Sequence, residues 1–520
     1  MRKDVPVKRL GWILTALILA EAVANLNLTV ALVALPAIGD AFEASQVQLN
    51  LVAVGYSLGL AGSVLYLGAV GDRYGRKPLL LIGTIAAIPC SLLAAYAPSV
   101  EFLAVARVLG GVAAGAAYPT TLSLISAVWP AGASRTRAIA LWSALGGASA
   151  ALGPLVGGAL LTTFWWGSVF LFTIPLAVLA VILVWIFVPS GVNQGTEPVD
   201  HLSGVLSILT IGTLILAINL LPQPGSTTIA LSLLGASIVL AALFVWRQLA
   251  GRYPLYDLRV AARRTFWVAG VAGIIVFGAF MGAVFIGSQY VQDVLGYSAL
   301  ESGFTTVPFA LFMVIAAPMS ARLISRYGSR TTLLCGYLAF FLGFLIMLLF
   351  WRENTALWVV LAAYVILGVG TGLAGTPAAR SLTGSVPVEK VGMASGTADL
   401  QRDLGGSLLQ SAMGALLTAG YASAFAGVIA SQGDKISSQV QSMLLESYSG
   451  AEAVAQRYPQ YAQQITDAAR QAFLTGDQWA YALAILAVVA GAALVFFAFP
   501  RHKREIDLLE QYEKVDSRSS

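Results

Sequence analysis

The chain has 520 residues, of which 58% are hydrophobic and only 11% charged, and its mean hydropathy is +0.81. So few polar residues cannot cover the surface of a water-soluble domain, so the composition excludes a soluble enzyme and indicates a polytopic membrane protein. The net charge of +5 is explained by basic loops between apolar segments and indicates no nucleic-acid partner.

Fourteen apolar runs approach or exceed the ~20 residues with which a helix crosses a bilayer. The first run follows the basic segment 1–9 and lacks a small-residue cleavage site, so it is predicted to be a span and not a signal peptide. An even count with both termini in the cytoplasm places most Lys and Arg residues in cytoplasmic segments, as the positive-inside rule requires. The predicted spans are 11–36, 47–70, 79–97, 101–126, 138–161, 168–188, 202–221, 228–246, 266–290, 302–324, 331–350, 356–379, 394–420 and 478–499.

A tight loop joins the second and third predicted spans, and its basic residues favour the cytoplasmic side. Its glycine and charged positions are Gly68, Asp72, Arg73, Gly75 and Arg76. Gly75 permits a turn with positive φ, and Asp72 can accept hydrogen bonds at a helix N-terminus or pair with an arginine. We expect this loop to control conformational balance; an ordinary basic loop is the alternative interpretation.

A weak internal repeat indicates two related halves. The segment 322–330 echoes the loop motif, with Ser325 at the position of Asp72. Transporters use such repeats to build two rocking bundles around a central site. The expected organisation is an N-terminal six-helix bundle (1–190), two linking membrane helices (191–250), a C-terminal six-helix bundle (251–500) with an extracellular helical insert (421–477), and a polar, solvated cytoplasmic tail (501–520).

Two further motifs lie in the fourth and fifth predicted spans. The segment 103–111 centres on Arg107, and the fifth span contains Gly153, Pro154, Gly157 and Gly158, which allow a bend and close helix contact. With the loop motif, these segments resemble the major facilitator superfamily. The segments 166–175, 290–298 and 392–396 resemble its fourteen-helix drug:proton antiporters, of the QacA and EmrB type. The resemblance covers about residues 8 to 500.

The resemblance implies an all-α major facilitator fold and a multi-pass protein of the plasma membrane, expected to be bacterial and monomeric. It implies proton-coupled export of amphipathic small molecules, which we expect to be cationic, with substrate, protons and the lipid bilayer as partners. Export of an endogenous metabolite or lipid is the alternative. No enzyme activity, cofactor or metal site is expected, because no Walker motif or nucleophile–base set is found and His201 and His502 are isolated.

Charged side chains inside spans are expensive to bury, so each is a functional candidate. The candidates for proton coupling are Asp403, Glu21, Asp399 and Arg107. Burial favours the protonated form of a carboxylate, so such an acid can carry a proton. Asp403 ranks first because it lies deepest in its span.

Each candidate also has a structural alternative. Glu21 could pair permanently with Arg107, Asp399 with Arg402 three residues on, and Arg107 could instead be satisfied by backbone carbonyls. The related antiporters carry an aspartate where this chain has Asn27, which cannot titrate. An acid in the first span would then have to be Glu21.

Polar and aromatic side chains in the spans are candidates for a cation-binding cavity, although such residues more often serve packing. They are Asn25, Asn27, Tyr56, Tyr118, Trp142, Phe280 and Tyr364.

Overall fold

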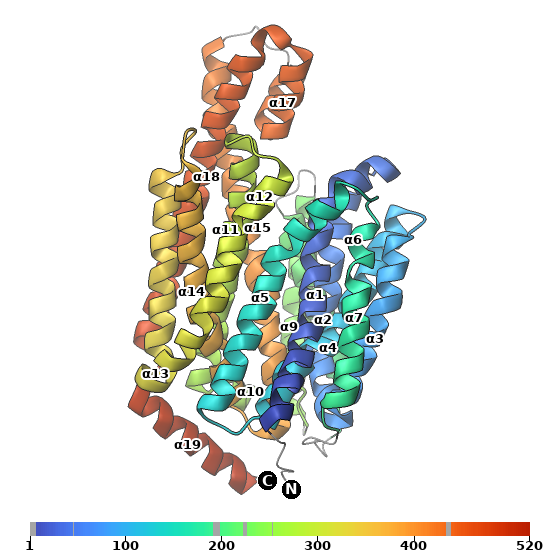
Figure 1. The fold of residues 1–520 in the computed structure, drawn as a ribbon, viewed down its shortest axis with the longest axis vertical. Coiled ribbons are helices and arrows are strands. Elements are labelled where there is room, and N and C mark those ends of the chain that lie inside the picture. Colours follow the sequence, from blue (N-terminus) through green and yellow to red (C-terminus); the bar gives the residue numbers. More distant parts are fainter. Residues whose placement is uncertain are drawn as a thin grey trace.

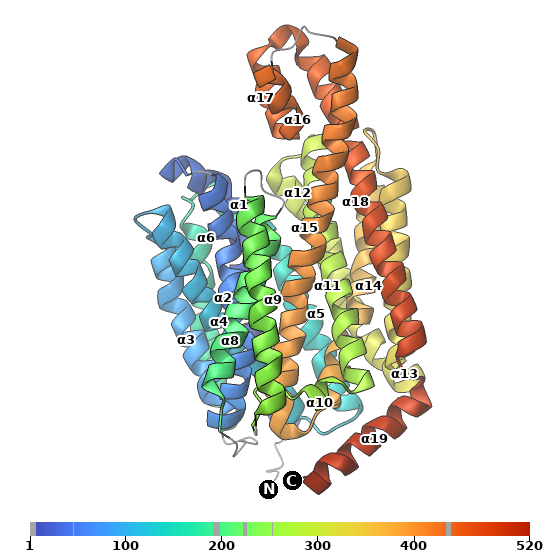
Figure 2. The same ribbon diagram turned by 180° about the vertical axis from the view of Figure 1, so that it is seen from behind.

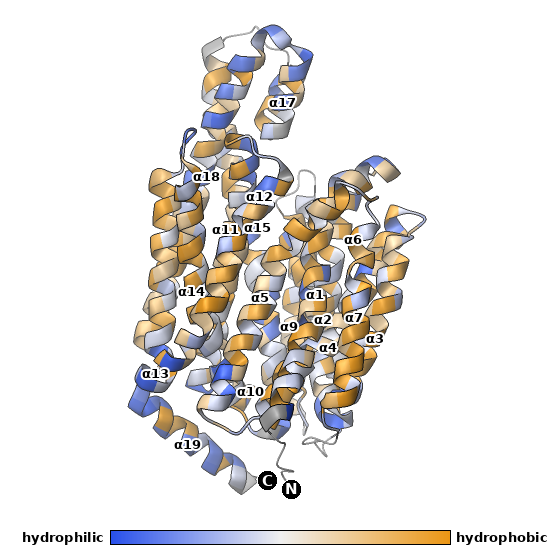
Figure 3. Ribbon diagram, viewed as in Figure 1, coloured by the Kyte–Doolittle hydropathy of each residue, from blue (hydrophilic) through white to orange (hydrophobic). Residues whose placement is uncertain are grey.

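The computed structural model describes residues 7–44, 46–190, 198–221, 226–251, 253–432 and 438–519. Every regular element in these ranges is helical, and thirteen of the helices are long and apolar enough to cross a membrane. The predicted all-α polytopic fold is confirmed. Apolar residues cover the middle of the bundle, whereas polar residues gather at its two ends (Figure 3).

The N-terminal half is a bundle in which α2 packs on α4, α1 on α5 and α3 on α4 (Figure 1). Glycines permit the closest of these approaches: a Cβ on Gly111 of α4 would collide with the Tyr56 carbonyl of α2. The elements are α1 (Val7–Phe42), α2 (Gln46–Tyr74), α3 (Arg76–Ala95), α4 (Val100–Val128), α5 (Ala133–Leu161), α6 (Ser168–Leu171) and α7 (Thr173–Phe187).

Two further helices, α8 (His201–Leu220) and α9 (Thr227–Ala250), pack against each other, and α8 also packs on α2 and α15 (Figure 2). Asp200 and Arg247 join their ends through an ion pair of 2.9 Å. Burial would raise the pKa of Asp200, but hydrogen bonds from Arg247 and Ser203 outweigh it and hold this pKa below its ordinary value.

The C-terminal half follows the short helix α10 (Leu258–Ala261) and packs α13 on α14 and α11 on α15. Helix α13 contains the predicted span 331–350 and most of the predicted span 302–324, with Gly328 at a non-helical φ of 84° between them. The difference between thirteen helices and fourteen predicted spans arises at this residue. The elements are α11 (Arg264–Gln289), η1 (Tyr290–Val294), α12 (Ala299–Thr305), α13 (Val307–Phe350), α14 (Leu357–Gly384), η2 (Val388–Lys390), α15 (Val391–Gln432) and α18 (Ala462–Ala498).

The insert and the tail lie at opposite ends of the bundle (Figures 1 and 2). In the insert, α15 and α18 continue outward, and α16 (Ser438–Glu446), α17 (Tyr448–Arg457) and η4 (Pro459–Tyr461) lie between them. The tail differs from the solvated segment we expected. It forms helix α19 (His502–Ser519), which lies across the end of α13 and buries the side chain of Glu505.

Candidate functional site

A buried ion pair joins the two halves in the middle of the bundle. Arg402 of α15 donates to Glu21 of α1 over 2.9 Å, with 11% of the Arg402 side chain and none of the Glu21 side chain exposed. The same guanidinium nitrogen donates to the Tyr118 hydroxyl of α4. Arg402 therefore belongs to one half but has its strongest partners in the other.

A polar network extends from this ion pair into the N-terminal half. The Tyr118 hydroxyl donates to the Asn25 side-chain oxygen over 3.0 Å, and the Asn25 amide donates to the Gly146 carbonyl over 2.9 Å. A Cβ on Gly146 would overlap the Glu21 carboxylate, so only glycine lets α5 approach α1 here. The sequence predictions for Glu21, Asn25 and Tyr118 thus converge on one place.

Aromatic rings enclose the Arg402 guanidinium from both halves. The rings of Trp142 on α5 and Phe277 on α11 each have centroids 4.8 Å from its central carbon. Trp142 is fixed by its indole N–H, which donates to Thr121 over 2.9 Å. Such contacts stabilise a cation away from water, so this position suits either an arginine or another organic cation.

Two more acids lie beside the ion pair. Asp399 is 1% exposed, and neither of its carboxylate oxygens has a hydrogen-bond partner among the described residues. In the same part of the structure, one oxygen of Asp403 and one of Glu21 also lack partners. One arginine cannot neutralise three carboxylates in a low-dielectric interior, so the cluster favours states in which it holds protons.

A cavity of about 160 Å³ adjoins Arg402 and Asp403. It lies among α1, α2, α8, α11 and α15, so one of the two linking helices contributes to its wall. The lining residues are Leu28, Thr29, Leu32, Ala53, Val54, Ser57, Asn219, Met281, Arg402, Asp403, Gly406, Ser407, Gln410 and Ser411.

Arg107, the arginine among the predicted coupling residues, has only uncharged partners in the part of the chain that the structure describes. Arg107 donates to the Asn27 carbonyl over 2.6 Å and to two further carbonyls over 3.4 Å, those of Leu28 and Val52. The Tyr56 ring lies 4.7 Å from its guanidinium. The pairing of Glu21 with Arg107 that we considered is wrong, because the acid pairs with Arg402.

The remaining predicted cavity residues lie elsewhere. The Asn27 side chain donates to the Val23 carbonyl and accepts from Thr173, on the Arg107 side of α1. In the core of the C-terminal half, Phe280 stacks on Phe309 at 4.8 Å, and Tyr364 packs edge-on to Trp351 at 6.0 Å. The seven predicted residues therefore do not line one cavity. Of these seven, Asn25, Tyr118 and Trp142 contact Arg402 or its hydrogen-bond partners.

The loop motif joins the halves at the end of the bundle that carries the tail. One oxygen of Asp72 accepts from Arg76 over 2.9 Å, and the other accepts from the Gly392 backbone N–H of α15 over 2.8 Å. Gly75 has a φ of 112°, and a Cβ on Gly68 would lie 2.7 Å from the Gly392 carbonyl. Arg73 lies against the ring of the adjacent tyrosine, 6.0 Å away. An acid of one half thus accepts a hydrogen bond at a helix N-terminus of the other.

The glycine motif of α5 packs against α1 and α12. A Cβ on Gly153 would overlap the Thr29 hydroxyl, and one on Gly157 would lie 3.0 Å from the Val30 side chain. Gly158 has more room, with Leu300 at 3.9 Å, and Pro154 lies inside the helix. Gly153 and Gly157 therefore make the close helix contact that the motif predicts.

Sequence reasoning missed three features of this site. Helical spacing favoured Asp399 as the partner of Arg402, whereas the ion pair of Arg402 crosses to Glu21. Sequence reasoning also left out Asn219 and Gln410 of the cavity wall. A polar residue on an otherwise apolar helix, as Asn219 is on α8, is the signal that could have indicated it.

The family model described as "Major Facilitator Superfamily" matches residues 17–431. The chain belongs to the major facilitator superfamily. Multidrug efflux pump LfrA of Mycolicibacterium smegmatis is 35% identical over 494 residues, 94% of this chain and 97% of that protein. Methyl viologen resistance protein SmvA of Salmonella typhimurium is 29% identical over 489 residues, covering 93% and 96%. The fold matches the crystal structure of the human organic anion transporter MFSD10 with a TM-score of 0.61 and 13% identity, over 95% and 100% of the chains.

Proposed function

We propose that this membrane transporter is a proton-driven exporter of amphipathic, cationic small molecules. Its relatives are named for multidrug efflux and for resistance to methyl viologen, which is an organic dication. The observation that carries the proposal is the ion pair between Arg402 and Glu21 across the two halves, beside Asp399 and Asp403. A pair that joins two rocking bodies can be broken and remade during each cycle.

Protonation would control this pair through charge. When Glu21 binds a proton, its attraction to Arg402 weakens, and the halves lose one bond that holds them together. Asp403 lines the cavity beside the guanidinium, where a cationic substrate would contact its carboxylate. A proton that binds Asp403 would remove the negative charge that attracts the substrate, so the two would compete for this acid and proton entry would be coupled to substrate exit.

The cavity wall suits an amphipathic molecule. Leu28, Leu32, Val54 and Met281 give apolar contact, while Ser57, Asn219 and Gln410 provide hydrogen bonds. Its volume of about 160 Å³ is smaller than the ~300–1,000 Å³ of typical ligand sites, so substrate entry requires the halves to separate further.

Proton flux in liposomes tests the proposal. The purified protein would be reconstituted with a pH-sensitive dye inside, and methyl viologen would be added as the probe. We expect a proton flux that depends on methyl viologen, and no such flux with Asp403→Asn. The matched control is Asp507→Asn, which changes an exposed acid of α19. Methyl viologen transport without proton movement would overturn proton coupling, and neutral lipids or metabolites moving in its place would favour the alternative substrate class.

A further inference from the structure

The cytoplasmic ends of the two halves are closed by different means, although both contain the same type of turn. In the N-terminal half, Arg76 follows Gly75 (φ 112°) and pairs with Asp72. In the C-terminal half, Ser329 follows Gly328 (φ 84°), and the residue at the position of Asp72 is Ser325. The second turn therefore lacks a carboxylate of its own.

A carboxylate from the tail occupies this turn instead. Glu505 of α19 accepts from the Ser329 backbone N–H over 3.0 Å and from the Ser329 hydroxyl over 2.6 Å. The N–H belongs to the first turn after the Gly328 break, where backbone donors lack helical acceptors. Only 4% of the Glu505 side chain is exposed, so these bonds are shielded from water.

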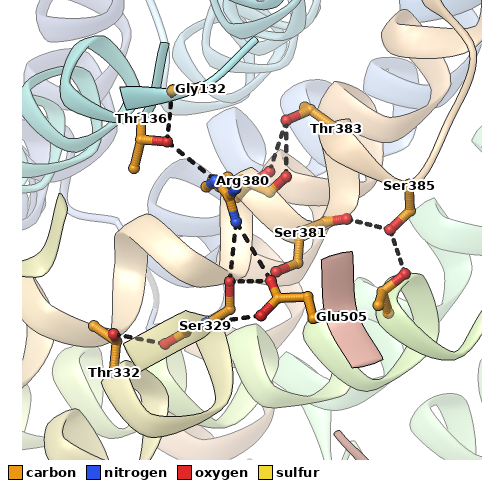
Figure 4. Close-up of polar contacts among 12 residues, drawn as sticks. Gly132, Thr136, Ser329, Thr332, Arg380, Ser381, Thr383, Ser385 and Glu505 are labelled. Atoms are coloured by element: carbon orange, nitrogen blue, oxygen red, sulfur yellow. Dashed lines mark hydrogen bonds and ion pairs between the residues drawn. The ribbon is translucent and has the colours of Figure 1, made fainter. Parts of the chain in front are cut away.

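Glu505 also contacts an arginine that reaches the other half. Arg380 of α14 donates to the Ser329 hydroxyl over 3.2 Å and lies 3.4 Å from the Glu505 carboxylate. Its Nε donates over 3.0 Å to the hydroxyl of Thr136, at the start of α5 in the N-terminal half. Figure 4 shows Arg380 between Thr136 on one side and Ser329 with Glu505 on the other.

A second contact fixes the far end of α19. Asp516 pairs with Arg263 at 2.5 Å, and the Tyr512 ring lies 4.6 Å from the same guanidinium. Arg263 also donates to the Ser385 carbonyl at the end of α14. The tail is therefore held at both of its ends against the C-terminal half, with Glu505 directed into the turn.

We propose that Glu505 is a positioning residue for alternating access: through Arg380 it holds Thr136 and keeps the cytoplasmic side closed. The tail supplies the acid that the second turn lacks, and it contributes to the same closure as the Asp72 contact with α15. When the halves separate on this side, the Arg380–Thr136 hydrogen bond must break. Removing Glu505 leaves Arg380 free to turn toward solvent, because 27% of its side chain is already exposed.

Distance measurements between spin labels test this role without any substrate or proton gradient. Cysteines would be placed at Ser134 on α5 and Ser325 on α13, both exposed, in a full chain whose Cys90 and Cys335 are alanine. We expect Glu505→Gln to raise the ratio of long to short distances about tenfold, because the neutral amide loses the charge-assisted hydrogen bonds that the carboxylate makes. Asp507→Asn, on the exposed side of the same helix, is expected to leave the ratio unchanged.

A double-mutant cycle separates positioning from local support of the tail. If Glu505 acts through Arg380, adding Thr136→Val to Glu505→Gln changes the ratio much less than the product of the two single effects. An unchanged ratio in monodisperse Glu505→Gln protein would overturn the proposal, as would single effects that multiply. Should Glu505→Gln fail to fold, Arg380→Lys keeps the positive charge but removes the Nε donor, and it must shift the ratio in the same direction.

Discussion

Arg107 and Arg402, two of the arginines in the interior of the bundle, have opposite surroundings. Arg107 lies within one half and donates to backbone carbonyls, which cannot change their charge. Arg402 reaches from one half into the other and pairs with a carboxylate, which can. Both have aromatic rings beside them, so the rings do not distinguish the two sites.

Under the proposed mechanism, this difference decides where a bound proton would change the conformation. Because backbone carbonyls do not titrate, the hydrogen bonds of Arg107 within its own half do not depend on protonation. Arg402 pairs with a titratable acid of the other half, so the strength of this ion pair would depend on protonation. Asp399 and Asp403 lie nearby as further acceptors. Both arginines are desolvated, but only the Arg402 ion pair of these two joins the two halves, which the proposed mechanism requires to move apart.

The largest expected effect comes from removing the acid beside the cavity. Asp403→Asn keeps the size of the side chain but cannot bind a proton, so uphill efflux should fall to background while downhill exchange of substrate remains measurable. The assay is substrate accumulation in inverted vesicles, with and without an uncoupler. Glu21→Gln is the matched comparison. A gradient in the Asp403→Asn protein that collapses with uncoupler would exclude this acid as the coupling site, and loss in Glu21→Gln alone would assign the role to α1.

Replacing each arginine by glutamine tests the contrast directly through stability. Arg107→Gln removes the hydrogen bonds that the buried guanidinium donates to three carbonyls and should cost about 2–3 kcal/mol at any pH. Arg402→Gln leaves the buried Glu21 carboxylate without its cation, so the cost of this substitution should depend on pH. Thermal unfolding of the purified proteins at several pH values measures both, and parallel pH curves for the two variants would refute the contrast.

A smaller effect is expected where the halves meet at the end of the bundle that carries the tail. Asp72→Asn removes the ion pair with Arg76 and weakens the hydrogen bond from Gly392, so we expect transport to slow by about three- to tenfold while insertion stays normal. Initial efflux rates at matched expression measure this change. Asp40→Asn, at an exposed position in the other end of the bundle, serves as the control. Equal rates for both variants and the parent would remove Asp72 from conformational control.

The membrane fold followed from the sequence because apolar length and basic loops are encoded locally. The candidate site could be predicted from the sequence only in part. Buried charges could be recognised as candidates one by one, and Glu21, Tyr118 and Trp142 do lie together. Their partners could not be predicted, because Arg402 and Glu21 are brought together by the docking of two halves, and helical spacing favoured the local pair of Arg402 with Asp399. The role of Glu505 was hidden for the same reason: a charged tail looks solvated until the turn that receives it is known.

The last prediction concerns the side of the membrane to which the cavity beside Arg402 opens. Helix α15 starts beside Asp72 and runs past Arg402 toward the insert, so the cavity residues from Asp403 to Ser411 lie on the insert side of the ion pair. If the basic tail end is cytoplasmic, this cavity faces outward. Cysteines at the exposed positions Gln463, in the insert, and Ser134, at the tail end, report on the two sides in a chain without Cys90 and Cys335. An impermeant maleimide should label Gln463→Cys in intact cells and Ser134→Cys only after permeabilisation. The reverse pattern would turn the cavity toward the cytoplasm, and protons would then have to reach Asp403 from inside the cell.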